Sequence, residues 1–292
     1  MRYFIRNSTL FLRGDFTAAS TGIKGGIKRV FTILNHTVPD TFDHAEPQKY
    51  LDLLVARYGF GPEYFGLLTA VEMNALCVLQ YDFITVFVTA GVRNPNPDGP
   101  GTINIIVHSR EGFSPGAMLE AIITATEAKA HALISRGHTF TGTSTDAVVV
   151  AYEGEEQVHT YAGTLTEAGS RIYEAVRFGV TESLKRHEGE VSSTGSTFFI
   201  FSRYGGHRWV EWSPKDCPYY PCHFEGQRCD FCYCPFYPCL DEELGAWVES
   251  SSGGYVWSCQ KCELVHIPVV ADYLQKYPEA SLQELKRLRE KK

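Results

Sequence analysis

Six short segments in the first part of the chain alternate apolar and polar residues or run apolar throughout, which predicts β-strands. They are Tyr3–Leu12, Arg29–Leu34, Phe65–Leu68, Ile84–Thr89, Thr102–His108 and Asp146–Tyr152. Several are rich in β-branched residues, as strands buried on at least one face are.

Three longer segments predict helices. Gln48–Tyr58 follows Pro47, which suits a first helical turn, and Thr166–Arg186 is a second candidate. Pro115–Arg136 begins after Ser114, a good N-cap residue, and ends at Gly137. At about 100° per residue, one stripe of this helix is expected to face the core, with Glu127 and Lys129 at its two margins. The stripe comprises Leu119, Ile122, Ile123, Thr126, Ala130 and Leu133.

Strands and helices interleave irregularly, which favours an α+β fold: a layered mixed β-sheet with packed helices, followed by a small Cys-rich, metal-stapled domain. We expect a first domain at 1–190, a linker with an aromatic hairpin at 191–213, and a Cys-rich domain with a C-terminal helix at 214–292. The polar run at 187–197 favours the linker, and Gly205-Gly206 predicts the hairpin turn. Ser281 and Glu284 form a capping box that would open the terminal helix.

The composition is that of a globular protein, with 44% apolar and 21% charged residues and a formal net charge of −7. No apolar stretch reaches the roughly 18 residues needed to span a bilayer, and the N-terminal segment has no secretory pattern. These features predict a cytoplasmic protein that binds neither membranes nor nucleic acid.

Polar clusters stand where three of the predicted strands end or begin. They are Asn35-His36, Thr89 with Gly91, and the run Thr141–Asp146. Such positions offer free backbone N–H groups and short side chains to a ligand, although each cluster alone is also explained by turn formation. Glu127, at the helix margin, could be a half-desolvated general base or part of a solvated flank.

The runs GPGTINIIV, SPGAMLEAIITATEAKAHAL and FTGTSTDAVVVAY, with ILNHTVP and FVTAGVRN, resemble the adenosylcobinamide amidohydrolase family over residues 15–185. They occur in the family's order and at its spacing. The resemblance implies hydrolysis of the aminopropanol amide of adenosylcobinamide, giving adenosylcobyric acid for corrinoid salvage. It implies a corrinoid substrate and no cofactor in the hydrolase domain.

The family's recurrent positions can be carried onto this sequence residue by residue. The candidate catalytic residues are Glu127, His36, Asp146 and Thr143, and the candidate substrate-binding residues are Asn35, Thr89, Gly91, Thr102, Asn104, Lys129 and Thr145. No GxSxG or HExxH motif is present. We therefore expect water or a Thr hydroxyl as nucleophile, Glu127 or His36 as base, and backbone amides of residues 141–146 around the oxyanion.

Eight of the nine cysteines fall between Cys217 and Cys262. In a reducing compartment such pairs are metal ligands more often than disulfides. The ligand-type residues are Cys217, Cys222, His223, Cys229, Cys232, Cys234, Cys239, Cys259, Cys262 and His266. Because four soft ligands complete a tetrahedral site, they could fill two zinc sites; an iron–sulfur cluster is the alternative. The pattern also resembles small cysteine-rich domains joined to this amidohydrolase, a resemblance that names no activity.

From Asp216 to His266 there are two Lys/Arg and eight Asp/Glu residues, a balance that repels phosphates. A stabilising or protein-contact role, through a homo-oligomer or another partner, is the better prediction for this region. Two further readings of the whole chain remain open. One is a non-hydrolytic corrinoid-binding or chaperone protein whose metal-binding module recruits a partner. The other is a metal-dependent regulator, which the acidic charge disfavours.

Overall fold

The computed structural model describes residues 1–39, 41–43, 45–92, 101–154, 157–191, 199–204, 208–211, 220–231, 234–236, 239–249, 255–277 and 280–290. The chain divides into two compact units, one within Tyr3–Trp209 and the other within Val210–Lys292. The described part of the chain contains no helix with the length and apolar character needed to cross a membrane.

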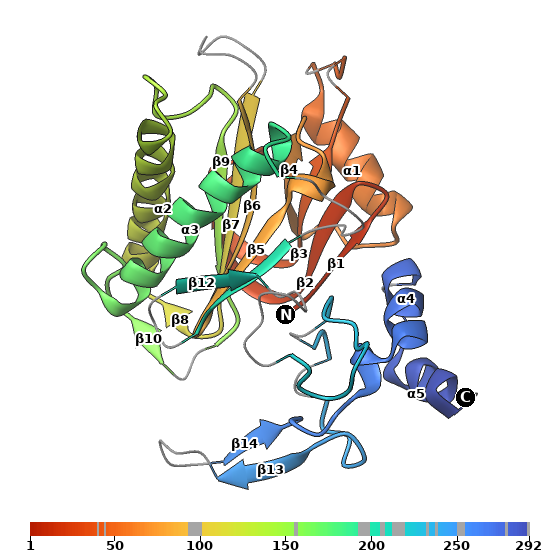
Figure 1. The fold of residues 1–292 in the computed structure, drawn as a ribbon. Helices are drawn as coiled ribbons and strands as arrows, with labels where there is room; N and C mark the ends of the chain where they lie inside the picture. The colour runs from red at the N-terminus through yellow and green to blue at the C-terminus, as the bar shows by residue number, and fades with distance from the viewer. Residues whose placement is uncertain are drawn as a thin grey trace. The chain divides into compact units, whose positions relative to one another are not determined.

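The first unit is built on a mixed sheet, which confirms the predicted α+β class (Figure 1). The strand order is β12-β11-β5-β6-β7-β9-β2-β3-β4, with β1 paired to β2. In chain order these strands are β1 Arg2–Arg6, β2 Thr9–Ser20, β3 Gly26–Thr37, β4 Tyr64–Thr69, β5 Cys77–Tyr81, β6 Ile84–Val92, β7 Gly101–Ser109, β9 Ala147–Tyr152, β11 Phe199–Tyr204 and β12 Arg208–Glu211. The pairs β3–β4, β7–β9 and β5–β11 are parallel, and β2 pairs antiparallel with both β3 and β9.

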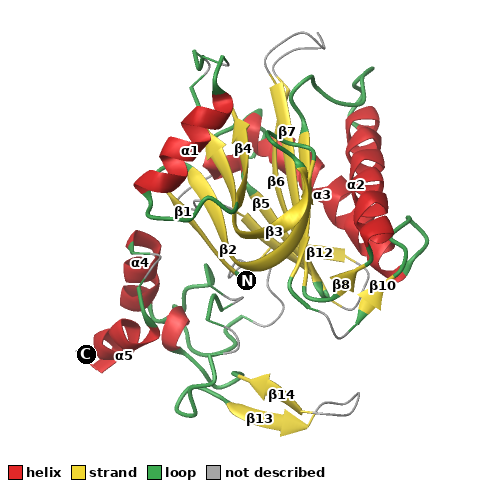
Figure 2. Cartoon of the chain, turned by 180° about the vertical axis from the view of Figure 1, so that it is seen from behind, coloured by secondary structure: helices red, strands yellow, loops and turns green. Residues whose placement is uncertain are grey.

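The sheet curls so that its β3–β4 end approaches β7, although β9 and β2 lie between them in the strand order. The side-chain amide of Asn104 on β7 donates hydrogen bonds to Asn35 Oδ1 of β3 (2.9 Å) and to the carbonyl oxygen of Leu68 on β4 (2.8 Å). Figure 2 shows this strongly curved sheet with α1 on one side and α2 on the other. The curl brings strand ends from distant parts of the sequence together.

The predicted strand Tyr3–Leu12 was wrong as a single element. Asn7 and Ser8 take the left-handed conformation, with φ of 47° and 55°, and divide it into β1 and β2. The strand β5 was not predicted. The predicted aromatic hairpin corresponds to β11 and β12, which extend the sheet because Phe199 pairs with Cys77 of β5. Its Gly205-Gly206 turn, and residues 192–198 of the predicted linker, lie outside the described residues.

The three predicted helices are present as α1 Pro47–Arg57, α2 Pro115–Ser135 and α3 Glu167–His187. The Ser114 side chain accepts a hydrogen bond from Ala117 N and caps α2 as expected. Gly137 follows this helix with a φ of 88°, the conformation that a glycine adopts most easily. Two short strands, β8 Gly112–Phe113 and β10 Val158–His159, pair beside these helices.

The predicted core face of α2 was wrong for most of its six residues, of which only Leu133 is fully buried. Leu119 and Ile123 are 53% and 57% exposed, whereas the buried side is formed mainly by alanines. The buried side comprises Ala117, Met118, Ala121, Thr124, Ala125, Ala128, Lys129, Ala132 and Leu133. The apolar residues among them join the core formed by α3 and strands β5, β6, β7 and β9. Small side chains allow the helix to lie close to α3 and the sheet, so size rather than hydrophobicity selects the buried face.

The described residues of the second unit form little regular structure. It contains the antiparallel pair β13 Ala246–Glu249 and β14 Tyr255–Ser258, and the helices α4 Pro268–Lys276 and α5 Leu282–Glu290. A small apolar cluster joins the two helices through Val270, Leu274 and Leu285. The predicted capping box is confirmed at the start of α5: Ser281 N donates to Glu284 Oε2 (2.7 Å), and Glu284 N donates to Ser281 Oγ (3.3 Å).

Candidate functional sites

A cavity of about 610 Å³ opens beside the curled sheet of the first unit, a volume within the usual range of small-molecule sites. Its wall consists mainly of loops after β2 and β3, strand β4, and the N-terminal ends of β7 and β9. The lining residues are Thr21, Gly22, Ile23, Val38, Pro39, Pro47, Gly66, Leu67, Leu68, Thr69, Ala70, Gly101, Thr102, Asn104, Ser144, Thr145, Asp146 and Ala147. Hydroxyl, amide and backbone groups therefore supply most of its polar surface.

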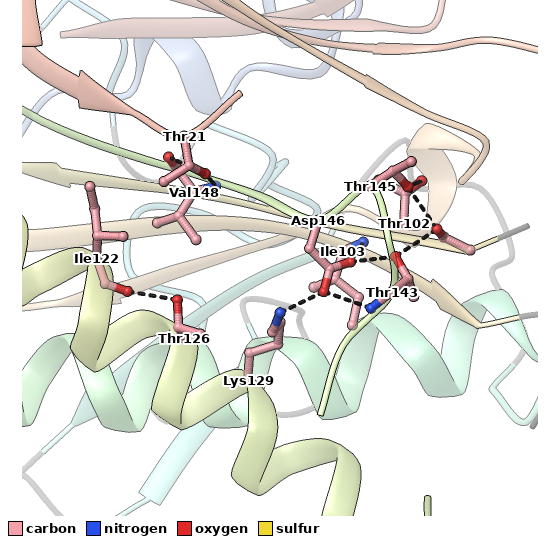
Figure 3. Close-up of polar contacts among 11 residues, drawn as sticks. Thr21, Thr102, Ile103, Ile122, Thr126, Lys129, Thr143, Thr145, Asp146 and Val148 are labelled. Carbon is pink, nitrogen blue, oxygen red and sulfur yellow. Dashed lines mark hydrogen bonds and ion pairs between the residues drawn. The ribbon is translucent and has the colours of Figure 1, made fainter. Parts of the chain in front are cut away.

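Asp146 fixes the loop between α2 and β9 at the edge of this cavity (Figure 3). Its Oδ1 accepts hydrogen bonds from Ile103 N (2.9 Å) and Thr143 Oγ1 (2.6 Å). Its Oδ2 accepts from Thr143 N (3.0 Å) and from Lys129 Nζ (2.5 Å). The Lys129 and Asp146 side chains are only 9% and 10% exposed, so this is a buried ion pair. With four donors on its two oxygens, the Asp146 carboxylate holds the loop against α2 and β7.

Gly142 allows the loop to pass close to this ion pair. A Cβ atom built on Gly142 would lie 2.5 Å from Asp146 Oδ2 and 2.6 Å from Lys129 Nζ, closer than real contacts allow. The loop then presents Ser144 and Thr145, both exposed, to the cavity. Thr145 Oγ1 lies 2.9 Å from Thr102 Oγ1 and 2.9 Å from the carbonyl oxygen of Gly101. The loop held by Asp146 and Lys129 therefore places the Thr145 hydroxyl next to the Thr102 hydroxyl at the cavity wall.

A buried amide network lies behind these hydroxyls. Asn35 Nδ2 donates to Thr89 Oγ1 (2.8 Å), and the Asn104 amide donates to Asn35 and Leu68. Both hydrogen bonds from Asn104 come from its nitrogen, so the direction of its carbonyl is fixed. Asn104 Oδ1 is buried and has no hydrogen-bond partner among the described residues. The predicted binding residues Asn35, Thr89 and Asn104 are thus brought together, and of these Asn104 lines the cavity.

The structure does not bring Glu127, His36 or Gly91 to the cavity wall. Glu127 is exposed on α2, about 200° around the helix from the buried Lys129. His36 points to the other side of β3 from Asn35, where Thr9 Oγ1 (2.6 Å) and Tyr50 Oη (2.8 Å) bind its ring nitrogens. Burial lowers the pKa of His36, which favours its neutral form. Gly91 is buried, and an added Cβ would meet Val71 and His187.

In the second unit, four cysteines lie near one another along a cavity of about 340 Å³: Cys234, Cys239, Cys259 and Cys262. The Cys259–Cys262 turn is closed by the Cys262 N–H, which donates to the Cys259 carbonyl oxygen (2.9 Å). Burial raises the pKa of the Cys234 thiol to about 12, and the nearby Cys262, Cys259 and Cys239 add to this rise.

A second group surrounds Gln227, which is 4% exposed. Its Oε1 accepts from the backbone N–H groups of His223 (2.9 Å) and Phe224 (3.3 Å), which turns its Nε2 toward sulfur. That nitrogen donates to Cys222 Sγ (3.1 Å) and Cys229 Sγ (3.6 Å).

The rings of His223 and His266 stack on each other, with centroids 4.5 Å apart. His266 Nδ1 lies 2.8 Å from the carbonyl oxygen of Arg228. Cys222, His223 and His266 line the same cavity as the four cysteines. Within the residues that the structure describes, no three His, Cys, Asp or Glu side chains converge closely enough to hold a metal ion. Cys217 and Cys232 lie outside those residues.

Comparison with known proteins decides the family of the first unit. The model of the adenosylcobinamide amidohydrolase family, CbiZ, matches residues 9–192. The chain belongs to this family. A second model, described as a cysteine-rich small domain, matches residues 208–289. The adenosylcobinamide amidohydrolase match contains every residue that lines the larger cavity.

Curated relatives agree with this assignment. An adenosylcobinamide amidohydrolase of Methanosarcina mazei is 44% identical over 196 residues, which cover 63% of this chain and 98% of that protein. Another, from Halobacterium salinarum, is 31% identical over 182 residues, 56% of this chain and 78% of that protein. A probable cobalt-factor III C(17)-methyltransferase of Methanothermobacter thermautotrophicus is 53% identical over 53 residues, 18% of this chain and 14% of that protein. No solved structure matches the chain.

Sequence reasoning missed several cavity residues of this amidohydrolase domain. Thr21 belongs to the turn after β2, where its backbone N–H and hydroxyl pair with Val148 at the start of β9 (Figure 3). Thr69 and Ser144 also line the cavity. The residue types alone gave no signal for Thr21, because isolated Thr residues are common in strands and turns. Ser144 lies inside the hydroxyl-rich run Thr141–Asp146, so the small and hydroxyl residues around it could have identified it as a cavity residue.

Proposed function

We propose that this chain hydrolyses the aminopropanol amide of adenosylcobinamide, giving adenosylcobyric acid and free aminopropanol in corrinoid salvage. The observation that carries the proposal is membership of the amidohydrolase family over residues 9–192, with the cavity inside that region. The cavity suits an amide-bearing side arm, because it combines neutral hydrogen-bonding groups with apolar wall residues such as Leu67 and Val38. The corrin ring itself would lie across the mouth.

Thr145 and Thr102 are the best-placed groups for the chemistry. Asp146 is the one ionisable side chain among the described lining residues, and its four donors make it a positioning group rather than a free base. In our proposal the paired hydroxyls either orient a water molecule or supply the Thr145 oxygen as nucleophile. The oxygen attacks the amide carbon, the C–N bond breaks, and the proton lost by the nucleophile passes to the departing nitrogen. If Thr145 is the nucleophile, a water molecule then hydrolyses the resulting ester, which releases the acid and restores the hydroxyl. Backbone N–H groups of Gly142, Ser144 and Thr145 are candidates for binding the oxyanion, since the N–H of Thr143 is bound to Asp146.

The test is to incubate the purified full chain with adenosylcobinamide and to measure released aminopropanol by mass spectrometry. We expect Thr145→Val to reduce turnover by about 10²-fold or more and Thr145→Ser to recover much of it, because Ser keeps the hydroxyl. The exposed Glu127→Gln variant is the matched control and should keep near wild-type turnover. Corrinoid binding without any product would instead support the non-hydrolytic binding protein. A larger loss in Glu127→Gln than in Thr145→Val would restore Glu127 as the base.

We further propose that the cysteine-rich unit binds zinc through its Cys and His residues. Support comes from the lining of the smaller cavity, where thiols and imidazoles dominate the polar groups, and from the tight Cys259–Cys262 turn. An iron–sulfur cluster is the alternative, because four cysteines also suit it. Elemental analysis with an absorption spectrum separates the two, since a zinc protein is colourless and a cluster absorbs visible light. Residence in the cytoplasm and a protein partner for this unit remain predictions from the sequence.

A further inference from the structure

The Asn104 side chain is held in one orientation by neighbours on two other strands. Its Nδ2 donates hydrogen bonds to the Leu68 carbonyl oxygen (2.8 Å) and to Asn35 Oδ1 (2.9 Å). A backbone carbonyl can only accept, so exchanging the nitrogen and oxygen of Asn104 would place two oxygens against each other at Leu68. Asn35 is fixed in turn, because its own Nδ2 donates to Thr89 Oγ1 (2.8 Å). The Asn104 oxygen therefore has a defined direction.

This oxygen is the unsatisfied group of the larger cavity. Asn104 lines the cavity and is only 1% exposed, yet its Oδ1 has no hydrogen-bond partner within the described residues. No other buried side-chain nitrogen or oxygen among the described lining residues lacks a partner. A buried carbonyl without a donor costs free energy, which favours a ligand that supplies the donor.

The spacing along β7 relates this acceptor to the hydroxyl pair. Thr102 and Asn104 point to the same side of the strand, whereas Ile103 between them joins the core on the other side. Two residues span about 7 Å of a strand. An amide whose N–H is bound to Asn104 has its carbonyl carbon about 4 Å from Oδ1, which leaves about 3 Å along the strand to a hydroxyl at Thr102 or Thr145. That is the distance at which a nucleophile attacks.

We propose that Asn104 Oδ1 accepts a hydrogen bond from the N–H of the amide that is cleaved, and so selects amides over esters. The proposal rests on the hydrolysis proposed above. In a trans amide the N–H and the carbonyl oxygen point in opposite directions, so this acceptor also turns the substrate carbonyl oxygen away from Asn104. Asn104 forms no covalent bond in the reaction. It determines which group is accepted and how that group lies.

The wild-type chain gives the first test. Its probes are adenosylcobinamide and the 1,2-propanediol ester of adenosylcobyric acid, in which oxygen replaces the amide N–H and the alcohol hydroxyl is kept. Dissociation constants are measured by stopped-flow mixing, before turnover. We expect the ester to bind about 10–100-fold more weakly, because it brings a lone pair instead of a donor to the Asn104 carbonyl. Equal affinities would overturn the proposal and would assign the Asn104 oxygen to water or to the retained hydroxyl.

The variant Asn104→Leu should bring the two affinities together, since its side chain neither accepts from an amide nor repels an ester. The matched control is Thr124→Val, because Thr124 lies outside the cavity wall but also makes a buried hydrogen bond, to the Ala162 carbonyl oxygen (2.7 Å). The control should keep the wild-type preference for the amide. A preference that persists in Asn104→Leu, or that both variants lose, would overturn the proposal.

Turnover is measured separately, so that the hydrolysis and the role of Asn104 can fail separately. A chain that binds the amide more tightly but releases no aminopropanol would keep Asn104 as the acceptor of that N–H and would not be a hydrolase. A chain that cleaves both probes and binds them equally would be a hydrolase without this selection. A chain that binds neither probe would overturn both proposals.

Discussion

The two units of this chain place their functional side chains by different physical means. In the amidohydrolase domain the cavity residues stand on strands, and on the loops joined to them, of a sheet whose core is packed by α2 and α3, and a buried ion pair fixes the loop between α2 and β9. In the cysteine-rich unit the described ligand-type residues stand on turns and loops, apart from His266 in the short 3-10 helix Leu264–His266. Its described apolar cluster has eight buried residues, drawn mainly from the segment that contains α4 and α5.

This difference teaches where the stability of each site originates. A large apolar core stabilises a fold whether or not a ligand is bound, whereas a segment with few buried aliphatic residues depends on cross-links. We therefore expect the hydrolase cavity to be preformed and the cysteine-rich loops to be fixed by metal. Perturbing each unit separately tests that contrast.

Removing the metal should unfold the cysteine-rich unit and leave the amidohydrolase domain folded. Structural zinc contributes on the order of 10 kcal/mol or more to small zinc-dependent folds, far more than eight buried side chains can replace. Treating the full chain with a strong chelator should make peptides from residues 220–290 exchange hydrogen rapidly, while β6 and β7 stay protected. Returning zinc should restore protection. Equal loss of protection in both units would show that the contrast is wrong.

Breaking the buried ion pair should be the most damaging single change in the first unit. Lys129→Met leaves the Asp146 carboxylate buried with three remaining donors, and such a loss costs about 3 kcal/mol. Urea unfolding with hydrogen exchange in β7 and β9 measures it. The exposed pair Lys49–Glu46 gives the control, and Lys49→Met should have no measurable effect. If both lysine variants behave alike, Asp146 does not depend on Lys129.

Crowding the same ion pair should have a smaller effect. In Gly142→Ala the new methyl group meets Asp146 and Lys129, and overpacking of this kind costs about 1–3 kcal/mol. Gly116→Ala is a matched control on α2, where the added Cβ lies 3.8 Å from Ser114 Oγ and should stabilise the chain by about 0.5 kcal/mol. The two variants should therefore move the urea midpoint in opposite directions. Movement in the same direction would contradict the close approach at Gly142.

Much of this arrangement could be predicted from the sequence, because periodicity and capping residues act locally. Ser114 and Gly137 bound α2 as expected. The helix face could not be predicted in the same way, because the choice between large and small apolar residues depends on how closely α2 approaches its neighbours. The choice of helix face also determines where Glu127 lies. Because Glu127 and Lys129 lie on opposite sides of α2, the face that buries Lys129 exposes Glu127.

The cavity, too, could be predicted from the sequence only in part. The run Thr141–Asp146 was recognisable because it holds more small and hydroxyl side chains than a turn requires. The contribution of Thr21, and the contact from Asn104 to Asn35 and Leu68, depend on the curl of the sheet. No local pattern encodes that curl. In the second unit the spacing identified the ligand-type residues, but it gave no sign that Gln227 donates hydrogen bonds to Cys222 and Cys229.

Acid should produce the smallest effect, and it should act through the buried histidines of the first unit. Burial lowers the pKa of His36 and of His108, so both resist protonation in the folded chain but accept a proton near pH 6.5 when unfolded. The unfolded state thus binds more protons below about pH 6.5, and stability is full above that pH and falls as the pH decreases toward the folded-state pKa. Each histidine contributes at most about 1.4 kcal/mol per pH unit in that window.

The variant His36→Phe should destabilise the chain at pH 7.5, because Thr9 and Tyr50 lose a hydrogen-bond partner. It should also reduce the slope of the unfolding free energy against pH between pH 7 and 5.5. Urea unfolding across that range measures the slope, and an unchanged slope would mean that His36 is charged in the fold.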